Sequence, residues 1–201
     1  RGCSAGKVEK INAGRSPIQD REIEELLASG KLRLRATLDA RAAYRAADFV
    51  VIAAPTNYDP QRNYFDTSAV ENVIGLAMEA NPEAMLVIKS TVPVGTARAL
   101  KERMAKRLAQ LGKDIPFDVA SNPEFLREGR AVGDFNNPDR IVLGVFSEEA
   151  GTRLRTLYKV FARSNKPIVV TTPETAEMIK YASNAFLATK ITFINEIANL
   201  C

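Results

Sequence analysis

Two glutamates stand four residues apart in the stretch NPEFLREG, which occupies residues 122–129. If this stretch is helical, Glu124 and Glu128 share one face, because residues four apart are neighbours on a helix. Carboxylates serve as general acids and bases, so such a pair could belong to a catalytic site. By itself, however, a proline followed by two glutamates is more typical of an ordinary acidic first turn of a helix.

The 201-residue sequence contains no histidine. This excludes His-based triads, imidazole general bases and His-ligated zinc from the chain. Its two cysteines, Cys3 and Cys201, stand at opposite ends and form neither a disulfide framework nor a CxxC metal pattern. We therefore expect no metal, and acid–base chemistry must fall to Glu, Asp, Lys, Tyr or an oriented water.

A second candidate is the turn STVPVGT, residues 90–96, which follows the apolar run AMLVIK. Backbone N–H groups at a helix start, together with Ser and Thr hydroxyls, can hold a phosphate, a carboxamide or an oriented water. A capped turn explains this pattern about equally well. Pro55 and Thr56, which end the run DFVVIAA, give a weaker signal, and an ordinary polar loop is the alternative there.

The third candidate lies in the last segment, residues 173–201. It carries Glu177, Lys180 and Asn184 at spacings of three and four, so these side chains project from one side of a helix. Apolar residues nearly surround its later turns, which predicts heavy burial. A buried ammonium and amide need polar partners. A Glu177–Lys180 surface pair is the simpler explanation, but we favour a site.

Short apolar, β-branched runs alternate with amphipathic stretches along the chain. The strand candidates are residues 32–36, 48–55, 84–90, 117–121, 140–145 and 167–172. The helix candidates are residues 20–30, 39–47, 66–82, 95–112, 147–163 and 173–201, with Asp20 and Ser147 as N-caps. The alternation predicts an α/β fold: a doubly wound, mostly parallel, Rossmann-like sheet followed by a long central helix. Ligands bind such folds beyond the carboxyl ends of the strands.

Charge and hydropathy exclude several classes of partner. The net charge is +4, from 28 basic and 24 acidic residues, and the basic residues are scattered among acidic ones. We therefore expect no nucleic-acid surface, although an anionic small molecule is compatible with the charge. No apolar run is long enough to span a membrane, and the cysteine usage favours a cytoplasmic setting. The chain begins with Arg rather than Met, so we expect its native start to lie upstream.

The motifs VIAAPT, KSTVPVGT, NPEFLREG, DRIVLG and AEMIKYASNAFLATKITFINEI occur in this order between Lys7 and the end of the chain. In this order they resemble the UDP-glucose 6-dehydrogenases, within the wider UDP-glucose/GDP-mannose dehydrogenase family. NPEFLREG and the Lys180/Asn184 helix are specific signals, whereas VIAAPT is not. The resemblance implies oxidation of the C6 alcohol of a nucleotide sugar to a carboxylate, with two NAD⁺ and a cysteine that forms a thiohemiacetal and then a thioester.

The resemblance also implies roles for NPEFLREG. Phe125, Leu126 and Arg127 would lie along the sugar nucleotide, partly through backbone groups. Glu124 would stand beside the substrate as an acid–base candidate. Glu128 would assist the water that hydrolyses the thioester and would lie near the nicotinamide.

The remaining implied roles fall on the other two candidates. Lys180 and Asn184 would bind the sugar and stabilise the oxyanion that develops at C6, and Thr91 would orient a catalytic water. The residues implied to border the NAD cofactor are Lys7, Pro55, Thr56, Ser90, Thr91, Val92 and Glu128.

Three departures from the family pattern indicate an internal fragment. The family's GxGxxG turn does not occur in this chain. The acidic residue that the family carries in the region before Lys7 is also absent. Cys201 stands too close to Lys180 in the sequence to be the family's nucleophile. The first six residues need not be native. We expect residues 1–171 to be a truncated NAD-binding domain and residues 172–201 the start of a central, dimerising helix domain, with no turnover by the fragment alone.

The expected substrate is UDP-glucose and the expected product UDP-glucuronate. The first alternative is a GDP-mannose 6-dehydrogenase, because this part of the family's chain discriminates poorly between the nucleobases of the two nucleotide sugars. The second alternative is a non-catalytic nucleotide-binding or interaction module, in which the missing motifs are real losses. A homodimer through the long apolar helix is expected in the enzyme.

Overall fold

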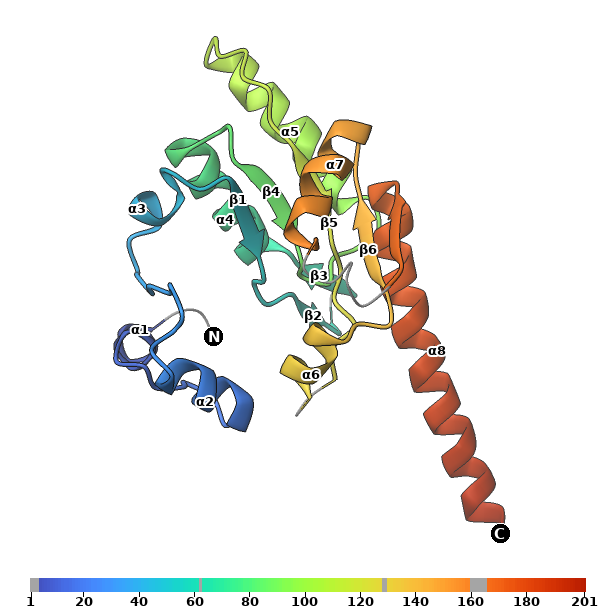
Figure 1. Ribbon diagram of the computed structural model, residues 1–201. Coiled ribbons are helices and arrows are strands. Elements are labelled where there is room, and N and C mark those ends of the chain that lie inside the picture. Colours follow the sequence, from blue (N-terminus) through green and yellow to red (C-terminus); the bar gives the residue numbers. More distant parts are fainter. Residues whose placement is uncertain (1–3, 62, 128–129, 160–165) are drawn as a thin grey trace.

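Figure 1 shows the computed structural model, which describes residues 4–61, 63–127, 130–159 and 166–201. The helices are α1 (Ala5–Asn12), α2 (Arg21–Ala28), α3 (Ala40–Tyr44), α4 (Ser68–Ala80), α5 (Thr96–Gln110), α6 (Ala131–Asn136), α7 (Glu148–Leu157) and α8 (Pro173–Leu200). The strands are β1 (Phe49–Ile52), β2 (Asn57–Asp59), β3 (Tyr64–Asp66), β4 (Met85–Ile88), β5 (Val119–Ser121), β6 (Ile141–Gly144) and β7 (Ile168–Thr171).

A five-stranded sheet in the order β1-β4-β5-β6-β7 forms the centre of the protein. Strands β1, β4 and β5 run parallel, and β6 and β7 run parallel to each other. The two groups meet at an antiparallel junction where Ser121 faces Gly144. The predicted mostly parallel, Rossmann-like sheet is therefore confirmed, with one antiparallel pair.

Apolar side chains on both faces of the sheet explain why helices cover both sides. On β4, Leu86 and Ile88 pack into one core with residues of α4 and α5. Met85 and Val87 point the other way, into a second core with Leu154 of α7. Because successive side chains of a strand alternate between faces, an all-apolar strand requires cover on both. This is the doubly wound arrangement that the sequence predicts.

Helix ends follow the predicted capping chemistry. The Asp20 carboxylate accepts the N–H of Ile23 at 3.1 Å, and the Ser147 hydroxyl accepts that of Ala150 at 3.1 Å. Both predicted N-caps are confirmed. Gly95 stands before α5 with φ of 90°, a conformation that favours glycine.

The predicted strand at residues 32–36 is wrong. These residues are irregular, and their leucines are about half exposed. A strand is stable only with a hydrogen-bonded neighbour, and among the described strands β1 pairs with β4 alone. The hairpin β2–β3, α1 and α6 were not predicted, because short polar segments carry weak periodicity.

A helix across NPEFLREG is also wrong for residues 122–127, which have no regular structure. The Asn122 N–H donates instead to the Ile88 carbonyl at 2.8 Å, which prolongs the edge of the sheet. The next residue, Pro123, has no backbone N–H group and therefore cannot donate a hydrogen bond to the sheet. Glu128 lies outside the described residues.

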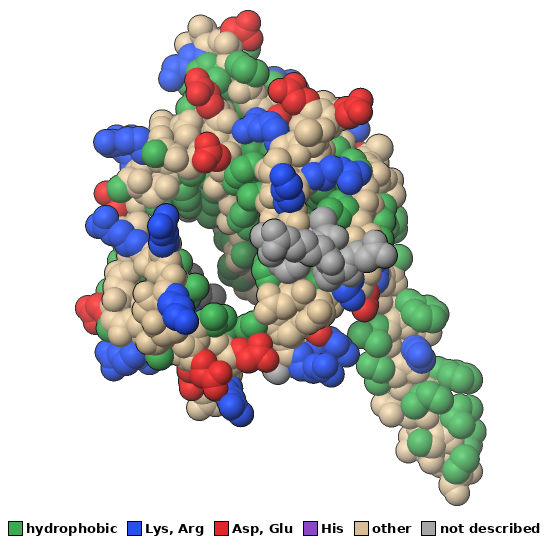
Figure 2. Space-filling view, viewed as in Figure 1, with side chains coloured by type: hydrophobic (Ala, Val, Ile, Leu, Met, Phe, Trp, Pro, Cys, Tyr) green, Lys and Arg blue, Asp and Glu red, His purple; other side chains and the backbone are tan. Residues whose placement is uncertain are grey.

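Helix α8 starts against the sheet and then projects away from it (Figure 1). A Cβ on Gly144 would lie 2.6 Å from the Ala176 Cβ and 2.7 Å from the Pro173 Cα, so this contact depends on glycine. The later turns expose apolar side chains such as Phe186, at 72%, and Phe193, at 62%. Figure 2 shows hydrophobic side chains along this projecting end.

The predicted heavy burial of these later turns is therefore wrong for this chain, because no described segment packs against them. Within the described ranges, no helix combines the length and apolarity needed to cross a membrane.

Candidate active site

The carboxyl ends of β1 and β4 lie side by side and are joined by hydroxyl groups. The Thr56 hydroxyl donates to the Thr91 carbonyl at 2.6 Å, and the Ser90 hydroxyl donates to the Ala54 carbonyl at 2.6 Å. The predicted cofactor residues Pro55, Thr56, Ser90 and Thr91 thus lie along one edge. The sequence placed these turns after strands, and the parallel register of β1 and β4 brings them together.

Two of the predicted cofactor residues differ from this group. Val92 is buried within the core, so any contact with a dinucleotide would use its backbone. Lys7 lies exposed on α1, which Figure 1 shows apart from the sheet. Its ammonium has no hydrogen bond or ion pair with another described residue.

The segment after β5 holds its shape through Asn122. This side chain is buried, and its amide donates to the Val142 carbonyl at 2.9 Å. Its amide oxygen accepts from Lys89 Nζ at 3.3 Å and from the Tyr158 hydroxyl. Glu124 follows two residues later, partly buried, at the end of the sheet rather than on a helix.

Arg127 is engaged with α6. Its guanidinium meets the Asp134 carboxylate at 2.6 and 3.0 Å, and its backbone N–H donates to the same carboxylate at 2.9 Å. These hydrogen bonds lower the pKa of Asp134 to about 2. The Arg127 side chain and its backbone N–H are therefore both occupied by a structural contact with α6.

Two cations lie close to the ring of Phe125. The guanidinium carbon of Arg140 is 4.2 Å from the ring centre, and Lys180 Nζ is 5.4 Å from it. Arg140 also donates to the Ser183 hydroxyl on α8 at 3.0 Å. These contacts join the segment after β5 to the helix that carries Lys180.

Two ammonium groups, those of Lys89 and Lys180, lie in the site. Burial lowers the pKa of Lys89 and of Lys180, and the negative charge of Glu124 acts against this effect in both. A neighbouring cation lowers each pKa further: Lys180 for Lys89, and Arg140 for Lys180. Neither ammonium forms an ion pair with any described residue. Ammonium groups without an ion-pair partner favour an anionic ligand or a transition state that develops negative charge.

Lys89 and Arg140 were missed at the level of sequence. Each stands directly at one end of a buried apolar strand, after MLVI and before IVLG. A charge beside a fully buried run is a usable signal, because such a charge needs a partner or a ligand.

One small pocket collects residues from the three candidate segments. Thr91, Pro123 and Lys180 line it together. A larger neighbouring pocket is lined by Lys89, Glu124, Phe125, Leu126, Arg127 and Arg140. Asn184 lies one turn beyond Lys180, exposed, and does not line either pocket.

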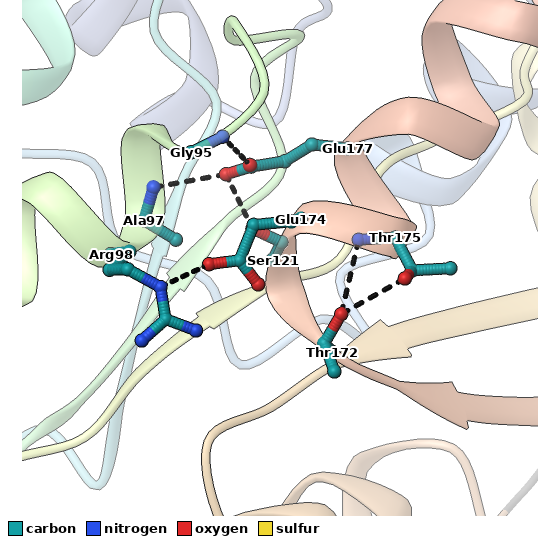
Figure 3. Close-up of polar contacts among 8 residues, drawn as sticks. All are labelled: Gly95, Ala97, Arg98, Ser121, Thr172, Glu174, Thr175 and Glu177. Atoms are coloured by element: carbon teal, nitrogen blue, oxygen red, sulfur yellow. Dashed lines mark hydrogen bonds and ion pairs between the residues drawn. The ribbon is translucent and has the colours of Figure 1, made fainter.

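Glu177 occupies an anchor position rather than the surface (Figure 3). It is 3% exposed and accepts the N–H of Gly95 at 2.6 Å, the N–H of Ala97 at 3.0 Å and the Ser121 hydroxyl at 3.0 Å. Burial raises the pKa of Glu177, and these hydrogen bonds only partly offset the effect. The alternative of a Glu177–Lys180 surface pair is therefore wrong.

The fold and the joined strand ends define the class: a nucleotide-binding α/β protein of the Rossmann-like type. Comparison with family models then identifies the family. Residues 3–162 match the NAD binding domain of the UDP-glucose/GDP-mannose dehydrogenase family, and residues 174–201 match its central domain. The chain belongs to this family, as its motifs predicted.

Individual relatives agree with this assignment. The chain is 39% identical over 200 residues to the UDP-glucose 6-dehydrogenase of Pseudomonas aeruginosa, covering 97% of this chain and 44% of that protein. It is 41% identical to the enzyme of the same name from Rhizobium meliloti, covering 98% of this chain and 45% of the relative. The chain thus spans less than half the length of these relatives.

Solved structures show the same fold. A UDP-glucose dehydrogenase from Pyrobaculum islandicum superposes with a TM-score of 0.83 at 39% identity, covering 96% of this chain and 45% of the other. A ternary complex of GDP-mannose dehydrogenase from Pseudomonas aeruginosa also gives a TM-score of 0.83, at 33% identity and with the same coverage.

Proposed function

We propose that the chain forms most of the NAD-binding domain, and the first helix of the central domain, of a UDP-glucose 6-dehydrogenase. The full-length protein would oxidise C6 of UDP-glucose to the carboxylate of UDP-glucuronate. The domains divide near residues 171 and 172. The observation that carries this proposal is the meeting of Thr91, Glu124 and Lys180, from three separate segments, at two neighbouring pockets.

The joined ends of β1 and β4 fit an NAD molecule. Pro55, Thr56, Ser90 and Thr91 present backbone groups and hydroxyls along one edge, where open α/β sheets hold dinucleotides. Lys7 would contact the adenosine end. When bound there, NAD⁺ supplies the hydride acceptor for oxidation at C6.

Lys180 is suited to stabilise negative charge on the C6 oxygen. Its ammonium is partly buried and faces no described carboxylate in an ion pair, so it can act on a bound substrate. Asn184, one turn further along the same helix, adds an amide donor. Glu124 takes the role of acid–base group beside the substrate, and Thr91 orients a water.

The segment from Phe125 to Arg127 lines the substrate. Within it, the guanidinium and the backbone N–H of Arg127 are both held by Asp134. Glu128 would assist the hydrolytic water. The family's nucleophilic cysteine would be supplied from outside this chain, so the 201 residues alone would not turn over.

Helix α8 would supply the surface for a homodimer, since its second half exposes Phe186, Ile191, Phe193 and Ile194. We place the enzyme in the cytoplasm, where its nucleotide substrates are available.

The test uses the full-length gene product, purified and assayed for NADH formation with UDP-glucose and with GDP-mannose. We expect two NADH per UDP-glucose and little turnover with GDP-mannose. GDP-mannose takes second place, because a GDP-mannose dehydrogenase shares the fold at lower sequence identity than the UDP-glucose enzymes. Preference for GDP-mannose would reassign the substrate. NAD⁺ binding without turnover of either sugar would favour a non-catalytic module.

A further inference from the structure

Three segments that carry the proposed site converge on one buried carboxylate, that of Glu177. Gly95 and Ala97 begin the helix that follows the Thr91 turn, and Ser121 is the residue before Asn122. All three donate hydrogen bonds to Glu177, which itself stands on the helix that carries Lys180 (Figure 3).

We propose that Glu177 is the positioning residue that holds Lys180 in register with the Thr91 turn and with the segment that carries Glu124. This inference rests on the proposed function. Lys180 follows Glu177 by three residues, so it projects from the same side of α8, about one turn along. Both line the small pocket that also contains Thr91.

The hydrogen-bonding pattern suits this role because both carboxylate oxygens are used. Oε2 accepts the Gly95 N–H, and Oε1 accepts the Ala97 N–H and the Ser121 hydroxyl. The start of α5 also favours negative charge through the helix dipole. A charged side chain at 3% exposure is rarely kept without such partners. Glu177 thus links three segments through one rigid contact.

Replacement of Glu177 by glutamine removes one of the two acceptors while it keeps the size of the side chain. With its oxygen at the Oε1 position, the substituted side chain would point an amide group at the Gly95 N–H, and two donors would face each other. We expect the start of α8, and Lys180 with it, to shift away from the Thr91 turn. Catalytic groups lose activity with displacements of about 1 Å.

Glu174 provides the matched control. It stands one turn earlier on α8 and also contacts α5, through an ion pair with Arg98. That pair is on the surface, where ion pairs contribute little. Glu174→Gln thus makes the same chemical change on the same helix without removing any hydrogen bond to Glu177.

The experiment measures kcat and KM of the full-length enzyme with NAD⁺ and UDP-glucose. We expect Glu177→Gln to lower kcat by about tenfold or more, the scale of a misplaced catalytic group, with little change in the KM for NAD⁺. Glu174→Gln should leave both unchanged. In a Lys180→Ala background, Glu177→Gln should cause no further loss of kcat, because the two residues act as a unit.

The outcomes separate this inference from the proposed function. If Lys180→Ala lowers kcat and Glu177→Gln multiplies that loss, positioning through Lys180 is wrong and the proposed function stands. Equal kcat values for Glu177→Gln and Glu174→Gln would also show that positioning through Lys180 is wrong while the proposed function stands. A normal kcat for Lys180→Ala itself would overturn both. If Glu177→Gln does not fold, Ser121→Ala replaces it in the same double-mutant cycle with Lys180→Ala. Ser121→Ala removes only one of the donors to Glu177, so an intermediate loss of kcat is expected.

Discussion

The two halves of α8 differ in almost every respect, although they belong to one continuous helix. The first turns bury Pro173, Ala176 and Glu177 against the sheet and place Lys180 in the site. The second half projects from the molecule and exposes large apolar side chains (Figure 2). Polarity within a helix therefore does not predict its burial here: the carboxylate is inside and the phenylalanines are outside.

This contrast follows from what each half meets. The first half meets the end of β6 and the start of α5, where free N–H groups require an acceptor. The second half meets no described segment, so its apolar surface remains available for another part of the protein or for a second copy.

The largest effect should come from the site half of the helix. Lys180→Ala in the full-length enzyme is expected to lower kcat by about 10²–10³-fold, the usual loss of one group that stabilises an oxyanion. The KM for NAD⁺ should change little. Lys190→Ala, on the exposed half, is the control and should leave kcat normal. Steady-state kinetics measure kcat for both variants. Equal kcat values for Lys180→Ala and Lys190→Ala would contradict the difference between the two halves of the helix.

The close contact at the start of the helix should limit stability. Gly144→Ala forces a Cβ into Pro173 and Ala176, and overpacking of this kind costs about 1–3 kcal/mol. Gly75→Ala, in α4 where no atom would oppose the new Cβ, should be neutral or stabilising by up to about 1 kcal/mol. Urea denaturation compares the two. Equal stability would mean that α8 can move off the sheet without loss.

The exposed half should affect association rather than folding. For the proposed homodimer of the full-length protein, Phe186→Ser combined with Phe193→Ser is expected to raise the dissociation constant by about tenfold or more. The free energy of unfolding of each subunit should change by less than about 0.5 kcal/mol. Leu111→Ser, an exposed leucine just after α5, is the control. Sedimentation that shows unchanged dimers for the double variant would assign another surface to the dimer.

The smallest effect concerns pH. In its proposed role Lys180 acts as the ammonium ion, so kcat should fall as the pH rises through its pKa, which burial and the charge of Arg140 lower. Arg140→Gln removes the like charge, raises the pKa of Lys180 and should move the alkaline limit of kcat upward by about one pH unit or less. A downward shift in the pH profile would show that Arg140 supports Lys180 in another way.

Sequence patterns predicted most of the sheet and several of the helices, because these elements repeat apolar residues at the strand or helix period. They failed at residues 32–36, where alternating Leu and Arg resemble a strand but no neighbour pairs with them. They failed again at residues 122–127, where spacing suggested a helix and the backbone joins the sheet edge instead.

The residues of the candidate site were named from their motifs, but their partners were not. Nothing in the spacing of Glu177 and Lys180 indicates that the first accepts hydrogen bonds from α5 while the second contacts Phe125. Lys89 and Arg140 entered the site only when the ends of β4 and β6 were placed beside Asn122 and Phe125.

The sequence by itself determined the family, the alternation of strands and helices, and the chemical groups available for catalysis, since each depends on local order along the chain. Only the tertiary structure decided which groups meet. Hydrogen bonds and charges act over a few ångströms. The residues that donate hydrogen bonds to Glu177, however, lie 56 to 82 positions away from it in the sequence. The buried glutamate and the exposed end of the same helix follow from that difference.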